Sequence, residues 1–208
     1  MLKKYSILIG ALIAVALLLV ATVLYPGGSY FSKTSVGFDW TKNFISNLFG
    51  EKAVNGADNA ARPWADAGMI FLSLSFSLFF SNFSKKIPAG LAAKIIKYMG
   101  AASMLFTFLI VTPLHDIMVL LSSTVFLVSL FYITYFVFKS KLTLLKFLCV
   151  LCLLIFYSTM YLYGVRNMDL LPIMQKATFV STILLVLVLE YFTKREDFEH
   201  IKMRAKNN

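Results

Sequence analysis

The stretch 113–116, Pro-Leu-His-Asp, interrupts two long apolar runs, 91–112 before it and 117–138 after it. Each run is long enough to cross a bilayer as a helix. Because proline cannot continue the hydrogen-bond ladder of a helix, the sequence predicts a sharp turn between two membrane-spanning helices. The turn places His115 beside Asp116 at the boundary of the hydrocarbon region. An ionisable pair there is costly without partners and is a candidate functional site; a polar hairpin tip wetted by lipid headgroups is the other interpretation.

The composition places the whole chain among membrane proteins. Its 208 residues are 59% hydrophobic and 14% charged, whereas a soluble domain carries about 25% charged residues. Further apolar runs at 5–25, 64–83, 144–163 and 170–192 bring the predicted spans to six. Only helices or closed barrels satisfy backbone groups in lipid, and runs of this length exclude a barrel. We therefore predict an all-α, polytopic six-transmembrane-helix bundle.

The distribution of charge predicts the orientation of this bundle. With both termini on one side of the membrane, that side carries the whole formal net charge of +10, and the opposite side is neutral. Such an excess on one side is the positive-inside pattern and not a nucleic-acid-binding surface. We expect cytoplasmic N- and C-termini, membrane lipids as partners and no nucleic acid. A membrane-protein partner or a homo-oligomer stays open.

The segments outside the predicted spans define the domain organisation. A single membrane domain covers 1–193, its first outer loop is 26–63, and a charged cytoplasmic tail follows at 194–208. A cleaved signal peptide is the alternative for the run 5–25. The apolar core of a signal peptide is usually only 7–15 residues and ends in a small-x-small site. The run 5–25 is longer and ends in Val-Leu-Tyr, so we predict a retained helix.

The first outer loop contains an amphipathic pattern. Apolar Trp40, Phe44 and Leu48 recur at helical spacing, which predicts a short helix over 38–49 lying in the outer interface, with Trp40 as its anchor. The same pattern is compatible with a lid folded over the outer mouth of the bundle. In that alternative, the polar residues presented inward are Asp39, Asn43 and Ser46.

The sequence offers no group of metal ligands or redox residues. Cys149 and Cys152 lie within an apolar run, without the polar neighbours that activate a thiolate, so we interpret them as two small apolar residues. A single outer histidine cannot supply the usual zinc ligands. We expect no metal and no cofactor.

Charged and aromatic side chains gather at the outer end of the predicted bundle. Lys176 lies about six residues inside the last span, or roughly 9 Å deep. Its ammonium group can extend to the boundary or pair inside the bundle with Asp116, Asp169 or Asp66. The candidate substrate-binding residues are Arg62, Arg166, Lys176, Tyr161, Asn43 and Trp40.

Three functional hypotheses follow, and they leave open whether the protein is an enzyme. The first is a lipid-interacting or assembly protein with a polar outer-face site around His115. The second is a lipid-modifying enzyme, in which His115 is the general base, Asp116 or Asp66 orients it and Ser46 is the nucleophile. The third is a small-solute or proton-coupled transporter, which the absence of visible inverted repeats disfavours.

Three motifs resemble a known family. They are Tyr-Pro-Gly-Gly-Ser at 25–29, Asn-Phe-Ile-Ser-Asn-Leu-Phe-Gly at 43–50, and the pair His115-Asp116. Together they resemble bacterial six-helix membrane proteins of unknown function, distantly similar to the DRAM and Sfk membrane proteins. The chain departs from that pattern with Asn47 where an Asp is usual and with an extra Phe49. The resemblance implies a six-helix fold, a bacterial inner (plasma) membrane and a role connected with lipids.

The position of the His115 imidazole distinguishes these hypotheses. We predict that it points into the outer mouth of the bundle, within hydrogen-bond reach of Asp66, Ser46 or a tyrosine of the fifth span. Geometry is the first requirement for a general base, ahead of a tuned pKa. An imidazole turned outward to lipid would remove the base that the catalytic hypothesis needs.

Overall fold

The computed structural model describes residues 2–206, and this part of the chain contains six helices long and apolar enough to cross a membrane. Two further helices lie in the first loop and in the tail. The predicted all-α six-helix bundle is confirmed. The helices are α1 (Leu2–Leu24), the 3-10 helix η1 (Ile45–Phe49), α2 (Arg62–Ser84), α3 (Gly90–Leu109), α4 (His115–Lys139), α5 (Thr143–Gly164), α6 (Leu171–Phe192) and α7 (Glu196–Lys206).

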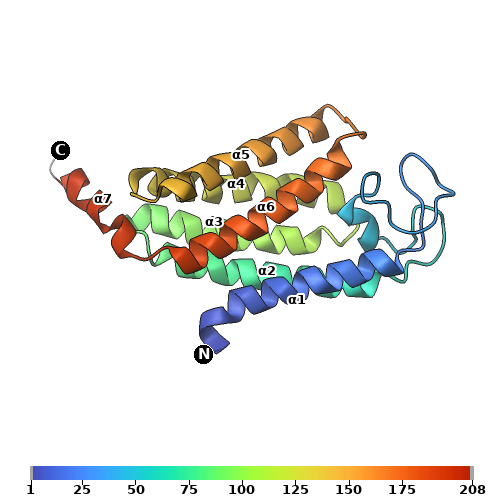
Figure 1. Ribbon diagram of the computed structural model, residues 1–208, viewed down its shortest axis with the longest axis horizontal. Helices are drawn as coiled ribbons and strands as arrows, with labels where there is room; N and C mark the ends of the chain where they lie inside the picture. The colour runs from blue at the N-terminus through green and yellow to red at the C-terminus, as the bar shows by residue number, and fades with distance from the viewer. Residues whose placement is uncertain (1, 207–208) are drawn as a thin grey trace.

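The long helices run along a common axis, with both ends of the chain at one end of the bundle and the first loop at the opposite end (Figure 1). We call these the terminal end and the loop end. Because α3 ends at Leu109 and α4 begins at His115, the predicted turn around Pro113 is present at the loop end. Prolines lie in the first turn of α2 and of α6, where the missing N–H has no intrahelical acceptor to lose.

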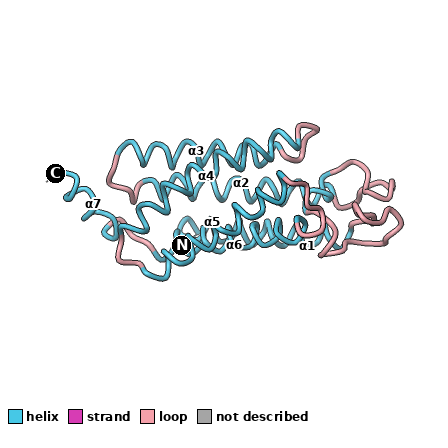
Figure 2. The backbone as a smooth tube through the Cα atoms, turned by 90° about the horizontal axis from the view of Figure 1, so that it is seen from above, coloured by secondary structure: helices cyan, strands magenta, loops and turns pink. Residues whose placement is uncertain are grey.

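The bundle consists of two groups of helices. In the first group α1 packs on α2, α2 on α3 and α3 on α4, and in the second α5 packs on α6. The α5–α6 pair contacts the first group mainly through α4 and α2, and much less extensively than neighbours contact each other within the group. Figure 2 shows the bundle from a second direction, with α3 along one edge and α5 and α6 toward the opposite edge. A seam with few close backbone contacts therefore separates the groups.

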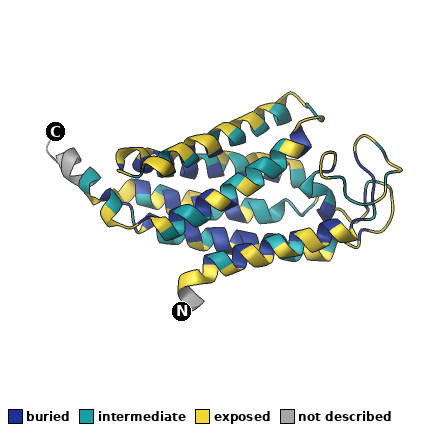
Figure 3. Cartoon of the chain, viewed as in Figure 1, coloured by how far each residue is buried: buried dark blue, intermediate teal, exposed yellow. Residues whose placement is uncertain are grey.

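Exposed apolar side chains cover the outside of the bundle. Leu74, Phe131 and Leu154 are each about 60% exposed, and Figure 3 shows exposed positions running along the outer faces of the long helices. In a soluble protein such faces would need a partner, whereas in a bilayer lipid covers them. The chain is therefore an integral membrane protein.

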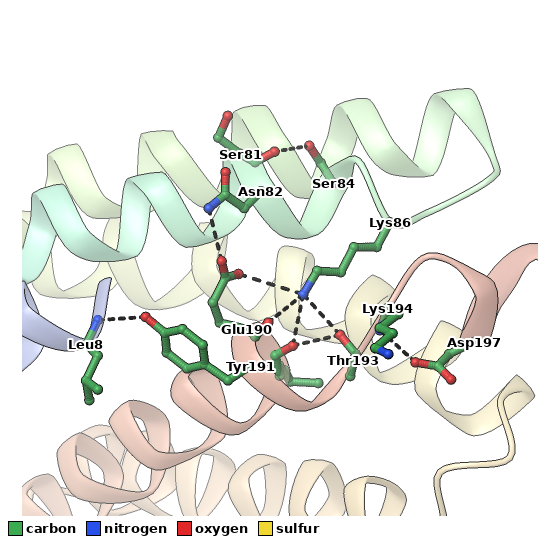
Figure 4. Close-up of polar contacts among 11 residues, drawn as sticks. Leu8, Ser81, Asn82, Ser84, Lys86, Glu190, Tyr191, Thr193, Lys194 and Asp197 are labelled. Atoms are coloured by element: carbon green, nitrogen blue, oxygen red, sulfur yellow. Dashed lines mark hydrogen bonds and ion pairs between the residues drawn. The ribbon is translucent and has the colours of Figure 1, made fainter. Parts of the chain in front are cut away.

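A polar cluster ties the seam at the terminal end (Figure 4). The Lys86 ammonium group donates hydrogen bonds to the carbonyls of Leu189 (3.3 Å) and Glu190 (2.7 Å) and to the hydroxyl of Thr193 (3.3 Å). It lies 3.9 Å from the Glu190 carboxylate, which also accepts a 3.0 Å hydrogen bond from Asn82. Burial lowers the pKa of Lys86 below its usual range, against the opposing effect of Glu190. This lysine satisfies carbonyls at the C-terminus of α6 and joins α6 to the α2–α3 turn.

The start of the tail packs onto the same end of the bundle. Phe198 of α7 is fully buried, with its ring centroid 5.8 Å from that of Phe83. The His200 imidazole donates a 2.9 Å hydrogen bond to the carbonyl of Lys139. The charged tail therefore begins with a docked helix.

Candidate functional site

The loop between α1 and α2, residues 25–61, forms a compact cap on the loop end of the bundle. Two buried asparagines hold it together. Asn43 donates to the carbonyl of Gly28 (2.7 Å) and accepts the N–H of Asp39 (2.8 Å). Asn59 donates to the carbonyls of Leu48 (3.1 Å) and Gly50 (2.8 Å). The cap has little regular secondary structure, so these side-chain amides supply hydrogen bonds to backbone groups that would otherwise be buried without a partner.

The turn at the start of the cap depends on glycine and on a buried tyrosine. Gly28 has φ +83°, and a Cβ at this position would lie 2.3 Å from the backbone nitrogen of Asn55. The Tyr25 hydroxyl accepts the N–H of Val54 (3.1 Å), and burial raises the pKa of this phenol. The Tyr-Pro-Gly-Gly stretch therefore fixes where the cap leaves α1.

The predicted interfacial helix over 38–49 is wrong in its extent and in its orientation. Only Ile45–Phe49 is helical, as a 3-10 helix. Leu48 is fully buried, Phe44 lines a cavity below the cap, and Trp40 is about half exposed. The apolar residues pack on the protein, so the segment is the lid that the same pattern allowed.

The polar residues of the lid do not all face inward. Ser46 lines the cavity, whereas Asn43 is buried inside the cap. The Asp39 carboxylate accepts the N–H and the hydroxyl of Thr41, and these hydrogen bonds lower its pKa. Ser46 is thus the one residue of the predicted three, Asp39, Asn43 and Ser46, at the cavity wall.

A cavity of about 390 Å³ lies beneath the cap, on the seam between the two groups of helices. This volume falls within the range of about 300–1,000 Å³ typical of ligand pockets. Most of its wall is apolar, and the apolar residues include Met69, Leu72, Phe76, Met104, Phe126, Phe156 and Phe179. Its polar wall residues include Ser46, Thr107, His115, Ser122, Ser123, Thr159, Tyr163, Gln175, Thr178 and Thr182.

His115 lines this cavity from the first turn of α4. Its Nδ1 lies 2.9 Å from Oδ1 of Asp116, whose side chain is 87% exposed. Its Nε2 is buried and has no hydrogen-bond partner among the described residues. Because an ionised carboxylate only accepts hydrogen bonds, Nδ1 donates to Asp116, and in the neutral form of the imidazole this leaves Nε2 as an acceptor.

The prediction for His115 is confirmed in its position and wrong in its partner. The ring is at the mouth of the bundle, but it bonds neither Asp66 nor Ser46 nor a tyrosine of α5. It pairs with the adjacent Asp116, because the turn that begins α4 lets the exposed carboxylate fold back to Nδ1.

Two of the candidate charged residues lie away from the cavity. Arg62 stands between Glu51 (3.2 Å) and Asp66 (3.6 Å), at the start of α2. Asp66 keeps one buried oxygen, Oδ1, without a hydrogen-bond partner among the described residues. Neither lines the cavity wall. Asp66 is therefore not placed to orient His115.

Lys176 joins α6 to the cap. Its ammonium group donates to the backbone carbonyls of Asn43 and of Pro172 (2.9 Å) and lies 5.6 Å from the centroid of the Phe38 ring. None of the predicted carboxylates is its partner. The neighbouring Gln175 accepts the N–H of Ile45 (2.8 Å), so adjacent residues of α6 hold the lid across the seam.

The remaining candidate residues lie outside the cavity wall, which is formed in part by other residues of α5 and α6. Tyr161, Arg166 and Trp40 are exposed and do not line the cavity. The wall instead takes Tyr163, Gln175 and a hydroxyl pair that sequence reasoning missed, Thr159 and Thr178, 2.7 Å apart. The available signal was the recurrence of polar residues in the otherwise apolar outer halves of α5 and α6.

No protein-family model, no curated protein and no solved structure matches this chain. Two of the predicted catalytic residues, His115 and Ser46, line the same cavity, and Asp116 is paired to the imidazole.

Proposed function

We propose that this chain is a lipid-interacting membrane protein that binds an amphiphile in the cavity, with the polar part of the ligand toward His115. The observation that carries the proposal is an apolar cavity whose polar wall groups include His115 at its loop end. Ligand pockets typically combine mostly apolar walls with a few polar groups that fix orientation. A lipid has the matching distribution of polar and apolar surface.

The depth of the wall residues fits such a ligand. His115 begins α4, and Phe126 lies eleven positions further along the same helix, so the cavity extends about 16 Å from the polar boundary at 1.5 Å per residue. Phe126 stacks on Phe156 of α5, with ring centroids 5.4 Å apart. An acyl chain reaching this aromatic pair would replace water by apolar contacts throughout its length.

A cavity-filling pair of variants on α4 tests the proposal. Ser123 lines the cavity and the adjacent Thr124 is exposed on the outside of the bundle. We expect Ser123→Phe to lower the amount of lipid co-purified with the protein by about tenfold, because the ring occupies the ligand's space. Thr124→Phe should leave it unchanged. Native mass spectrometry of both proteins in mild detergent measures the bound lipid, and equal occupancy in the two variants would contradict the proposal.

Catalysis at the same site is the second candidate, favoured by the pairing of His115 with Asp116. A carboxylate on Nδ1 orients an imidazole whose Nε2 can accept a proton, which is the arrangement of a general base. Ser46 lines the same cavity, although no hydrogen bond joins it to His115 among the described residues. The same mass spectra decide this candidate. A chemically changed lipid that disappears with His115→Ala supports it, and lipid unchanged after incubation contradicts it.

The orientation of the bundle is part of the proposal. The family resemblance supports a bacterial inner membrane, and the positive-inside charge pattern supports placing the terminal end in the cytoplasm. Cysteine labelling with a membrane-impermeant reagent on intact cells tests this, after Cys149 and Cys152 are replaced by alanine. We expect Ala57→Cys in the exposed part of the cap to be labelled from outside and Lys141→Cys at the terminal end to be protected. Labelling of Lys141→Cys but not of Ala57→Cys would show that the bundle has the opposite orientation in the membrane.

A further inference from the structure

The wall of the cavity is uncharged. Among the described residues, no lysine, arginine, aspartate or glutamate lines it. The nearby charges are engaged elsewhere: Lys176 donates to carbonyls of the cap and of α6, Arg62 pairs with carboxylates, and Asp116 is exposed on the far side of the imidazole. The cavity therefore offers hydrogen bonds without a counter-ion.

This wall disfavours an anionic headgroup. Phosphates and carboxylates in proteins are bound by arginine, lysine or clusters of N–H donors, and burying an unpaired anion costs far more than burying a hydroxyl. The groups that face a ligand here are an imidazole, hydroxyls and one amide.

We propose that the ligand is a neutral, single-chain amphiphile with a hydroxylated headgroup, of which a monoacylglycerol is the simplest example. This inference rests on the proposed function, because it names the class of lipid that the cavity takes. A volume of about 390 Å³ lies near the lower limit of ligand pockets, which suits one chain better than two.

The hydrogen-bonding capacity of the wall matches such a headgroup. Nε2 of His115 is buried and has no hydrogen-bond partner among the described residues. In the neutral imidazole that donates from Nδ1 to Asp116, this nitrogen is an acceptor, and a buried acceptor left unsatisfied is unfavourable. A ligand hydroxyl can donate to it, whereas an ionised phosphate or carboxylate carries no proton to donate. The hydroxyl is thus the complement of this histidine.

Two donors at the same end of the cavity complete the match. Gln175 uses its carbonyl oxygen to accept the N–H of Ile45, which leaves its amide N–H groups for a ligand. The Ser46 hydroxyl has no hydrogen-bond partner within the described part of the chain. A polyhydroxylated headgroup can accept from both while it donates to His115. The hydroxyls of Ser122 and Thr159 are less available, because they already donate within the protein, to Val119 and Ile155 respectively.

Three probes with the same oleoyl chain separate the possibilities: 1-oleoylglycerol, its 2,3-dimethyl ether and oleoyl lysophosphatidate. Their binding to the purified protein is measured by native mass spectrometry titration. We expect the wild-type protein to bind 1-oleoylglycerol about tenfold more tightly than either of the others. His115→Ala should lose the discrimination between oleoylglycerol and its ether, while Leu114→Ala, an exposed neighbour outside the cavity wall, should keep it.

The outcomes distinguish this inference from the proposed function. Tightest binding of lysophosphatidate or of the ether, abolished by Ser123→Phe, would overturn the neutral hydroxylated ligand and leave lipid binding in place. Binding of all three probes that Ser123→Phe does not affect would overturn both. If His115→Ala does not fold, the preference of the wild-type protein among the three probes still decides the headgroup.

Discussion

Lys86→Met is expected to lower the free energy of unfolding by about 3 kcal/mol, because it removes one partner from a buried, charged cluster. The side chains of Lys86 and Glu190 are 16% and 12% exposed. Without the ammonium group, the Glu190 carboxylate loses its ion pair and keeps the hydrogen bond from Asn82 to its other oxygen. The carbonyls of Leu189 and Glu190 also lose a donor at the end of α6.

Lys85→Met is the matched control, since Lys85 is the adjacent residue and is exposed. Thermal unfolding in detergent micelles, followed by fluorescence, compares the two variants. The double variant Lys86→Met/Glu190→Met should recover part of the lost stability, because it removes the unpaired carboxylate as well. Equal melting temperatures for Lys85→Met and Lys86→Met would show that the cluster does not hold the seam together.

The bundle could be predicted because each membrane-spanning helix is recognisable from its own stretch of sequence. A run of about twenty apolar residues has few alternatives in any protein, and the turn around Pro113 breaks a helix wherever it occurs. Tertiary contacts were not needed for these inferences. The structure accordingly places α3 and α4 on the two sides of that turn.

The cap could not be predicted from its pattern. Trp40, Phe44 and Leu48 show the same spacing whether their apolar side chains meet lipid or protein, since periodicity identifies a face and not what covers it. Two features decide between the lid and the interfacial helix. They are the buried amides of Asn43 and Asn59, which bond backbone carbonyls distant in sequence. Such hydrogen bonds cannot be predicted from a sequence pattern.

The candidate site was predicted in part for a similar reason. Sequence gives the depth of a polar residue in its span, which places His115 at the loop end of the bundle. It does not give the direction of a side chain toward a neighbouring helix. Lys176 shows the difference: its depth allowed either an ammonium group extended to the boundary or a carboxylate partner, but the group bonds backbone carbonyls, and any sequence can supply those.

Gly100→Ala is expected to destabilise the protein by about 3 kcal/mol and to weaken lipid binding, although alanine is the better helix former by about 1 kcal/mol. A Cβ at Gly100 of α3 would lie 2.1 Å from Cγ of Phe80. The Phe80 side chain is 1% exposed, so its ring cannot move aside into solvent. Phe80 in turn meets Phe126 edge to face, with ring centroids 6.0 Å apart, and Phe126 is part of the cavity wall.

Gly164→Ala provides the control, since a Cβ at that position meets nothing within 4 Å. It should be as stable as the wild type or more so. Thermal unfolding and native mass spectrometry of the two variants measure stability and bound lipid together. If Gly100→Ala is destabilised but binds lipid normally, the α2–α3 packing does not set the shape of the cavity. If it is as stable as Gly164→Ala, the close approach of Phe80 to α3 is wrong. Loss of both properties would show that the packing of α2 on α3 shapes the wall that the lipid chain contacts.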